Sequence, residues 1–212
     1  MPDGEDDAMI VTISRPYGAS ALAVSRIVAE RLGYRLVDDE LPVLAARRLG
    51  TSPDVVQTAL ERPRGFGERV LEQLGGGLPE SAQPASSTDD ELVAETRRAT
   101  EDAVREAAAA GNAVIVGRMA GAILGRRPDV LRVFVHAPLA WRIAHVAESL
   151  GVGEPAARDE IARIDEARAT YAKEQYRVTW GDARIYDLVL DTSRFGVGGS
   201  ADVIVAAVHA AE

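Results

Sequence analysis

The chain has no cysteine, only three histidines and no long apolar run, and each absence excludes a class of protein. Without cysteine there is no disulfide, no thiol catalysis and no cysteine-based zinc or iron–sulfur site. The histidines, His136, His145 and His209, stand in unrelated segments, so a histidine-based metal site is not expected. No apolar stretch approaches the ~20 residues that span a bilayer, and we expect no membrane partner.

An excess of basic residues is also lacking. The formal net charge at pH 7 is −9, which argues against a general surface for a nucleic-acid polymer but leaves room for a local basic pocket. The opening residues, MPDGEDDA, are acidic and lack the pattern of a secretory signal. We therefore expect a flexible tail over residues 1–8, a single domain over residues 9–212 and a cytoplasmic protein.

An apolar run, a small-residue turn and a helix pattern follow one another over Met9–Gly33. The run Ile10–Ile13 predicts a strand, and the apolar residues after the turn recur with the period of a helix. This is the layout of a phosphate-binding loop, in which backbone N–H groups and a helix N-terminus receive an anion. The pattern G-x-x-x-x-G-K-[ST] needs a lysine and a hydroxyl where this chain has Ala21 and Leu22. The frame of the loop is present without its charged parts.

Further strands and helices alternate along the chain, which predicts an α/β fold with a mostly parallel sheet covered on both faces. Strands are expected at Tyr34–Val37, Ala113–Val116, Val130–Val135 and Asp187–Leu190. Helices are expected at Leu41–Gly50, Ser52–Glu61, Phe66–Leu74, Pro138–Leu150, Pro155–Arg177 and Ser200–Ala211. A long helix should run from Thr88 or Asp89 to Ala110, and a short one should follow Gly117-Arg118 and end at Leu124. The block over about 39–90 is too long for a plain crossover, so we expect an insertion with a mobile loop at Ser81–Asp90.

Polar residues follow the predicted strands, and in open α/β sheets the ligand lies at that edge. They are Arg15, Asp38, Gly117-Arg118, His136 and Thr192-Ser193-Arg194. Asp38 fits an acidic cluster at a helix N-terminus as well as it fits a functional role. His136 fits better as a residue that orients its own loop. Arg118, directly after a glycine and an apolar strand, favours bidentate phosphate binding.

The helix pattern over Pro155–Arg177 carries several arginines among acidic residues, and two interpretations fit it equally. One is a solvated helix with ion pairs four residues apart, such as Asp159–Arg163. The other is a lid over about 151–182, whose arginines close over a polyphosphate and whose ends near 151–154 and 179–182 move.

Five segments together resemble the cytidylate-kinase-like family, a branch of the nucleoside-monophosphate kinases. They are VTISRPYG (Val11–Gly18), GGGLPE (Gly75–Glu80), VIVGR (Val114–Arg118), RVFVHAPL (Arg132–Leu139) and YDLVLDTSRFG (Tyr186–Gly196). The resemblance implies a three-layer P-loop kinase fold with a five-stranded sheet, a monophosphate-binding insertion and a lid. It also implies transfer of the γ-phosphoryl group of ATP to CMP or a similar monophosphate, with Mg²⁺ held through the nucleotide. The partners are then small-molecule nucleotides, and a homo-oligomer is left open.

The resemblance also implies roles for individual residues. The ATP loop would comprise Arg15, Pro16, Tyr17, Gly18, Ala19, Ser20, Ala21 and Leu22, with Thr192, Ser193 and Arg194 near the adenine. The acceptor would contact Asp38, Gly117, Arg118 and Asp165, and the catalytic arginines would be Arg118, Arg163 and Arg168, the last two from the lid pattern R-x-D-x-x-R.

Two departures from the family pattern leave a second function open. Met119 replaces an aspartate, which weakens the case for cytosine selectivity, and the loop has lost its later glycines. The Cβ atoms of Ser20 and Ala21 disfavour the positive φ angles that let a loop wrap a phosphate. The alternatives are therefore a kinase, a catalytically weak or inactive nucleotide- or phosphate-binding module, and a kinase for another small substrate.

Overall fold

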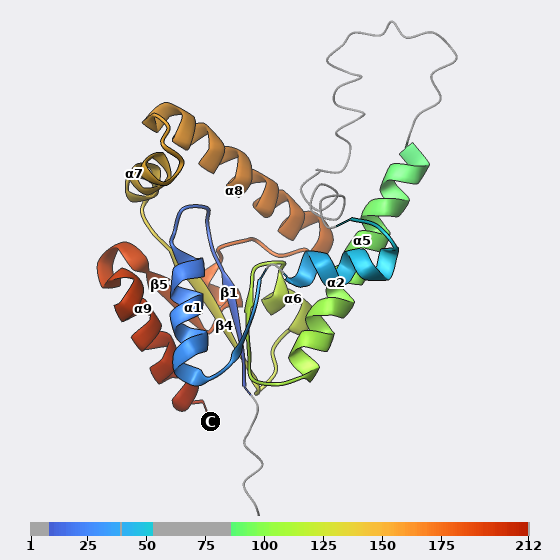
Figure 1. The fold of residues 1–212 in the computed structure, drawn as a ribbon, viewed down its shortest axis with the longest axis horizontal. Helices are drawn as coiled ribbons and strands as arrows, with labels where there is room; N and C mark the ends of the chain where they lie inside the picture. The colour runs from blue at the N-terminus through green and yellow to red at the C-terminus, as the bar shows by residue number, and fades with distance from the viewer. Residues whose placement is uncertain (1–8, 39, 53–85, 212) are drawn as a thin grey trace, which may run out of the picture.

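The computed structural model describes residues 9–38, 40–52 and 86–211, which build a parallel sheet with helices on both faces (Figure 1). The strands are β1 (Ile10–Ser14), β2 (Arg35–Val37), β3 (Ala113–Val116), β4 (Val130–His136) and β5 (Leu188–Asp191). They form one five-stranded sheet in the order β2-β3-β1-β4-β5, and every neighbouring pair is parallel. The predicted strands and their parallel pairing are confirmed.

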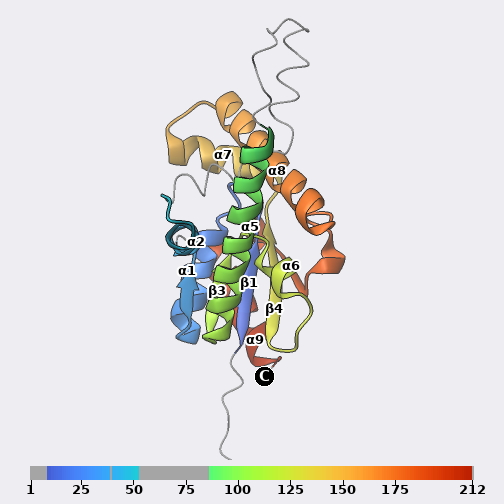
Figure 2. The same ribbon diagram turned by 90° about the vertical axis from the view of Figure 1, so that its right-hand side faces the viewer.

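Helices cover the sheet in two layers and also lie over one end of it. They are α1 (Ala21–Leu32), α2 (Glu40–Leu49), α5 (Ser86–Ala109), α6 (Ala120–Leu124), α7 (Leu139–Leu150), α8 (Glu154–Tyr176) and α9 (Thr192–His209), with a 3₁₀ turn at Ala183–Ile185. The helices α1 and α9 share a core with one face of the sheet, and α5 and α6 share a core with the other. Figure 2 shows α7 and α8 beyond the end of the sheet where the strands finish.

The central strands are apolar because both of their faces are covered. Every residue of β1 and β3 is buried. Val11 and Ile13 point into the core formed with α1 and α9, whereas Ile10 belongs to the core formed with α5 and α6. A strand that is buried on both faces reads as an unbroken apolar run instead of an alternating one. This is why IVTIS and AVIV could be recognised in the sequence.

Two helix boundaries differ from the prediction. The helix α9 begins at Thr192 and not at Ser200, because Asp191 accepts the N–H of Ser193 and caps the helix early. Gly196, with φ 67°, interrupts it and hid its first turn from the periodic pattern. The helix α5 begins at Ser86, so residues 86–90 of the expected loop are helical. The expected helices at 52–61 and 66–74, residues 81–85 and the tail at 1–8 lie outside the described residues, apart from Ser52.

The sheet brings the ends of its strands to one edge beneath α7 and α8. Arg15, Asp38 and Gly117 are the residues that follow β1, β2 and β3, which are neighbours in the sheet. At this edge of an open α/β sheet the side chains of successive loops converge. Within the described residues, no helix is long and apolar enough to cross a membrane.

Candidate functional site

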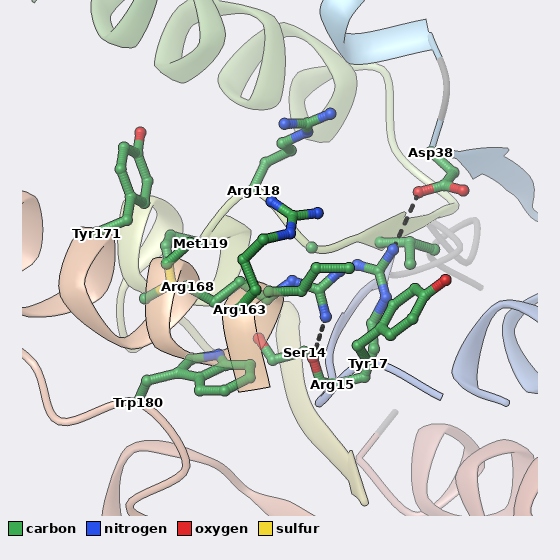
Figure 3. Close-up of a pocket in the computed structure, with 14 residues that line it drawn as sticks. Ser14, Arg15, Tyr17, Asp38, Arg118, Met119, Arg163, Arg168, Tyr171 and Trp180 are labelled. Atoms are coloured by element: carbon green, nitrogen blue, oxygen red, sulfur yellow. Dashed lines mark hydrogen bonds and ion pairs between the residues drawn. The ribbon is translucent and has the colours of Figure 1, made fainter. Parts of the chain in front are cut away.

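A cleft of about 480 Å³ lies at this edge of the sheet, between the strand ends and α8 (Figure 3). The described residues that line it are Ser14, Arg15, Tyr17, Asp38, Val116, Gly117, Arg118, Met119, Arg163, Ile164, Ala167, Arg168, Tyr171 and Trp180. Four of these are arginines and one is a carboxylate, Asp38. Although the chain carries a net charge of −9, the cleft is locally positive and suits an anion.

Arg15 crosses the end of β3 to reach Asp38. Its Nη2 lies 3.6 Å from Asp38 Oδ1, and the two side chains are only 21% and 17% exposed. The guanidinium passes over Gly117, where a Cβ atom would lie 2.2 Å from Arg15 Nη1. Gly117 is therefore required by the path of the Arg15 side chain as well as by its own φ of 74°.

The turn between β3 and α6 has positive φ at three consecutive residues. Gly117, Arg118 and Met119 have φ values of 74°, 53° and 55°. A non-glycine residue in this region costs roughly 1–2 kcal/mol, and such residues gather at functional sites. The turn leads from the buried strand directly into the cleft, and it presents Arg118 and Met119 there. Met119 is 8% exposed and gives this wall an apolar surface.

The helix α8 contributes Arg163 and Arg168 to the opposite wall. Arg163 is exposed and donates to Glu160 through Nε and Nη2, at 2.9 and 2.8 Å. Arg168 Nη1 donates to the carbonyl oxygen of Arg15 at 3.0 Å. Figure 3 shows both side chains reaching from α8 towards Arg15. The structure thus brings together the four arginines that the sequence had placed in separate segments.

The remainder of the predicted ATP loop does not line this cleft. Of the segment 15–22, only Arg15 and Tyr17 border it. Gly18, with φ 81°, lies so close to α7 that a Cβ atom would be 2.7 Å from Val146 Cγ2. Ser20 has φ 54°, contrary to the expectation that its Cβ atom keeps it from positive φ, and it immediately precedes α1. Pro16 is half-buried, Ala19 and Ala21 are buried, and Leu22 is half-buried on α1.

Three further predicted groups lie outside the cleft. The Thr192 hydroxyl is buried, 3.0 Å from the carbonyl oxygens of Ala19 and of His136, so it joins the loop to the end of β4. Ser193 and Arg194 are exposed in the first turn of α9. Asp165, expected on the acceptor, instead binds the backbone of Tyr17 and the side chain of Arg142.

Sequence reasoning missed an aromatic wall of the cleft formed by Tyr171 and Trp180, which lies on the side away from the predicted loop residue Tyr17 (Figure 3). Trp180 meets Phe134 edge-on, with ring centroids 5.9 Å apart. Burial raises the pKa of Tyr171 above its ordinary value. No periodic sequence pattern connects Tyr171 with Trp180. Tyr171 and Trp180 do lie within the predicted lid segment.

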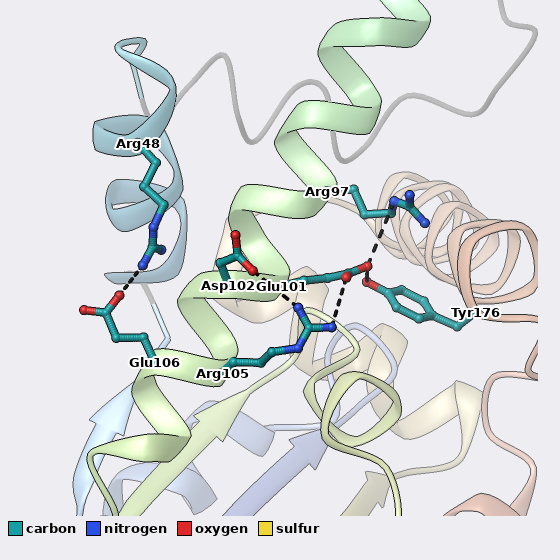
Figure 4. Close-up of polar contacts among 7 residues, drawn as sticks. All are labelled: Arg48, Arg97, Glu101, Asp102, Arg105, Glu106 and Tyr176. Atoms are coloured by element: carbon teal, nitrogen blue, oxygen red, sulfur yellow. Dashed lines mark hydrogen bonds and ion pairs between the residues drawn. The ribbon is translucent and has the colours of Figure 1, made fainter.

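Polar contacts fix the C-terminal end of α8 on α5, near this wall (Figure 4). The Tyr176 hydroxyl donates to Glu101 Oε1 at 3.3 Å, and Arg105 Nη2 lies 3.2 Å from Glu101 Oε2. Burial, the nearby Tyr171 and the Glu101 carboxylate all raise the pKa of Tyr176. On the other side of α5, Glu106 pairs with Arg48 of α2. The helix α5 therefore holds both α2 and the end of α8.

Comparison with known proteins gives one family. Residues 10–194 match the model of the cytidylate kinase-like family. A protein of Halobacterium salinarum named cytidylate kinase is 28% identical over 204 residues, which are 95% of this chain and 90% of the relative. One of the same name from Methanothrix thermoacetophila is 27% identical over 202 residues, which are 95% and 99% of the two chains.

Solved structures show the same fold at lower identity. An uncharacterised protein from Eubacterium ventriosum superposes with a TM-score of 0.65 at 20% identity, over 95% of this chain and 98% of its own. Shikimate kinase from Acinetobacter baumannii, in complex with shikimate, gives a TM-score of 0.51 at 13% identity, over 96% and 94%. The expected three-layer fold of the P-loop kinases is confirmed.

Proposed function

Because the chain belongs to the cytidylate kinase-like family, we propose that it is a phosphotransferase that moves the γ-phosphoryl group of ATP to a nucleoside monophosphate such as CMP. Two relatives that align over nearly their whole length carry the name cytidylate kinase. The observation that carries the proposal is the cleft, where four arginines and one carboxylate meet at the ligand-binding edge of the sheet. With ATP and small nucleotides as its partners, we place the reaction in the cytoplasm.

Arginine has to provide the cationic side chains of this site. The sequence contains a single lysine, Lys173, which is exposed on α8 and does not line the cleft. Arginine forms two parallel hydrogen bonds with a phosphate and keeps its charge at every physiological pH. In phosphoryl transfer the protein mainly positions the reactants and stabilises the charge that develops on the transferring group. Four arginines in one cleft suit that role.

The position of each arginine suggests its part in the reaction. Arg118 follows β3 beside Gly117, and we assign it to the acceptor phosphate. The carboxylate of Asp38 only accepts hydrogen bonds, so we assign it to donor groups of the acceptor and not to its phosphate. Arg163 and Arg168 come from α8, and we assign them to the transferring phosphoryl group. Arg15, which Asp38 holds over Gly117, takes the place of the missing loop lysine.

Metal binding is proposed only through the nucleotide. Within the described residues, no group of three or more histidine, aspartate or glutamate side chains could hold a metal ion by itself. Mg²⁺ bound to the ATP phosphates would add its charge to that of the arginines. The arginine-rich cleft fits such phosphates because its charge is opposite to theirs.

A second function is favoured by the loop itself. The nucleotide-hydrolysing pattern has a lysine and a hydroxyl where this chain has Ala21 and Leu22, which are ordinary residues of α1. In addition, α7 covers Gly18. A missing phosphate contact costs about 3 kcal/mol of transition-state stabilisation. The alternative is therefore a module that binds a nucleotide and turns it over slowly or not at all.

Calorimetric titration with CMP and with ATP tests the binding site. Arg118→Ala should weaken CMP binding by about 10-fold or more, because a charge-assisted hydrogen bond is lost. Its thermal midpoint should stay within a few degrees of wild type, because a half-buried surface arginine contributes little to folding. Arg158→Ala, an exposed arginine of α8, is the matched control and should bind CMP normally. Equal CMP affinity for wild type and Arg118→Ala would remove Arg118 from the site.

A coupled assay for ADP release, with ATP, Mg²⁺ and a panel of nucleoside monophosphates, separates the two functions. The kinase proposal expects turnover that depends on the monophosphate. Binding of both nucleotides without turnover on any acceptor would support the regulatory module instead. Because Met119 is apolar, we expect uracil and cytosine nucleotides to differ little as acceptors.

A further inference from the structure

Two side chains outside the cleft hold the backbone of Tyr17, one at its N–H and the other at its carbonyl oxygen. Asp165 Oδ1 accepts the Tyr17 N–H at 2.8 Å, and Arg142 Nη1 donates to the Tyr17 carbonyl oxygen at 2.9 Å. The two side chains also bind each other, with 2.7 Å between Arg142 Nη1 and Asp165 Oδ2. Arg142 Nε donates to the carbonyl oxygen of Ala137 at 3.2 Å. This ion pair, which we call the clamp, joins the loop after β1 to α7 and α8.

The clamp is shielded from water. The Arg142 side chain is 11% exposed and that of Asp165 is 21% exposed. Hydrogen bonds with charged partners are among the stronger ones, and a low local dielectric strengthens them further. Tyr17 also packs on an apolar cluster of α7 and α8 that contains Ile143, Val146 and Ile161. Polar and apolar contacts thus hold the same loop residue.

The loop depends on these external contacts because it has little to shape it from within. Gly18 is the one glycine between Arg15 and Leu22, and the chain has no lysine there. At Gly18 the approach of α7 leaves no space for a side chain, since a Cβ atom would also lie 3.3 Å from the Arg142 carbonyl oxygen. A phosphate-binding loop usually obtains its shape from several glycines, whereas this loop is held by neighbouring helices.

The clamp also connects the loop to the arginines of α8. Asp165 stands between Arg163 and Arg168 in the sequence, and Arg168 donates to the Arg15 carbonyl oxygen at 3.0 Å. The helix is therefore bonded to the loop at two points, Tyr17 and Arg15. Displacement of α8 from the loop would break both contacts and move its two arginines away from Arg15.

We propose that Arg142 and Asp165 are positioning residues, which set the shape of the loop after β1 and dock α8 on it. The arginines of the loop and of α8 then reach a bound nucleotide phosphate as one preformed group. The nature of the ligand rests on the proposed function, but the docking itself does not. Such preorganisation spares the site the cost of ordering its donors when the ligand binds.

Amide hydrogen exchange in the ligand-free protein tests the docking without any assay of activity. In Arg142→Gln and in Asp165→Ala, the Tyr17 amide should exchange about 10-fold to 100-fold faster than in wild type, because a bond to a charged group is lost or loosened. The amides of β1 and β3 should keep their wild-type rates. Arg158→Gln, an exposed arginine on α8, is the control and should leave Tyr17 unchanged. An unchanged Tyr17 rate in both clamp variants, or equal acceleration throughout the sheet, would overturn the proposal.

Titration with ATP then tests whether the docking serves the site. Each single clamp variant should bind ATP about 10-fold more weakly than wild type, and Arg142→Lys should recover part of the loss. The double variant should bind no more weakly than the poorer single variant, because the two side chains act through each other. Additive losses would contradict the clamp. If wild type binds neither ATP nor CMP, the proposed function fails, and the exchange rates alone decide on the docking.

Discussion

Gly117→Ala should displace Arg15 and so remove a cation from the cleft while the fold survives. A Cβ atom at this position would lie 2.2 Å from Arg15 Nη1 and 3.4 Å from its Cζ. Ordinary contacts between such atoms are about 3.5 Å, so the guanidinium has to move by about 1 Å or more. The Arg15–Asp38 pair, already 3.6 Å long, would not survive that movement.

The size of the effect follows from the same geometry. The φ of 74° at Gly117 costs alanine about 1 kcal/mol, and the displaced guanidinium adds little, because it is the flexible end of a side chain. We expect Gly117→Ala to lose about 1–2 kcal/mol of stability in urea unfolding and to bind ATP about 10-fold or more weakly in calorimetry. Gly33→Ala is the matched control, since φ there is 68° and no atom lies within 4 Å of the new Cβ.

The control isolates the part played by Arg15. Gly33→Ala should show the backbone cost of about 1 kcal/mol and wild-type ATP affinity. If both variants lose the same stability and both keep wild-type affinity, Arg15 has no contact with a phosphate. The assignment of Arg15 to the place of the loop lysine would then be refuted.

Two further predictions concern ionisable groups whose pKa the fold shifts. Hydrogen bonds from the buried Arg132 hold the pKa of Asp187 below its ordinary value of 3.8. The stability that this carboxylate contributes is therefore complete above pH 3.8, and it is lost as the pH falls through the lowered pKa. Asp187→Asn should therefore lower the free energy of unfolding by about 1–3 kcal/mol near pH 7, a figure that is discounted because Asp187 is one-third exposed. In urea unfolding, the difference from wild type should shrink towards about pH 2. Burial raises the pKa of Tyr171, Tyr176 and Tyr186 above 10.0, so the stability of the fold is retained below pH 10 and lost as the pH rises through the raised values. Absorbance at the phenolate band should show these three tyrosines ionising only with unfolding, and early, reversible ionisation of all five in the folded protein would contradict their burial.

The strands, and the edge of the sheet at which their ends meet, could be predicted from the sequence. Strands such as β1 and β3 are apolar throughout because they are covered on both faces, which leaves a clear signal. From the parallel order it follows that Arg15, Asp38 and Gly117 come together, and they do. The weakest predictions concerned helix starts, where a cap such as Asp191 competes with the periodic pattern.

Contacts between distant segments could not be predicted from the sequence. Asp165 lies in an R-x-D-x-x-R pattern that suggested a ligand contact, but its carboxylate binds the protein's own loop. Only one weak feature of the sequence pointed to a buried contact of Arg142. It stands four residues before the buried Val146 and therefore on the same side of α7. The dependence of Gly117 on the Arg15 side chain had no signal in the sequence, because it arises only when the two loops are folded side by side.

Transfer of the γ-phosphoryl group from ATP to CMP under single-turnover conditions tests the central claim most directly. Wild type and Arg158→Gln should form CDP at the same rate, since Arg158 is exposed and does not line the cleft. Arg168→Gln should form it about 100-fold more slowly, because a charge that stabilises the transferring group is lost. Absence of CDP from wild type, or equal rates for Arg168→Gln and wild type, would contradict phosphoryl transfer in the arginine-lined cleft.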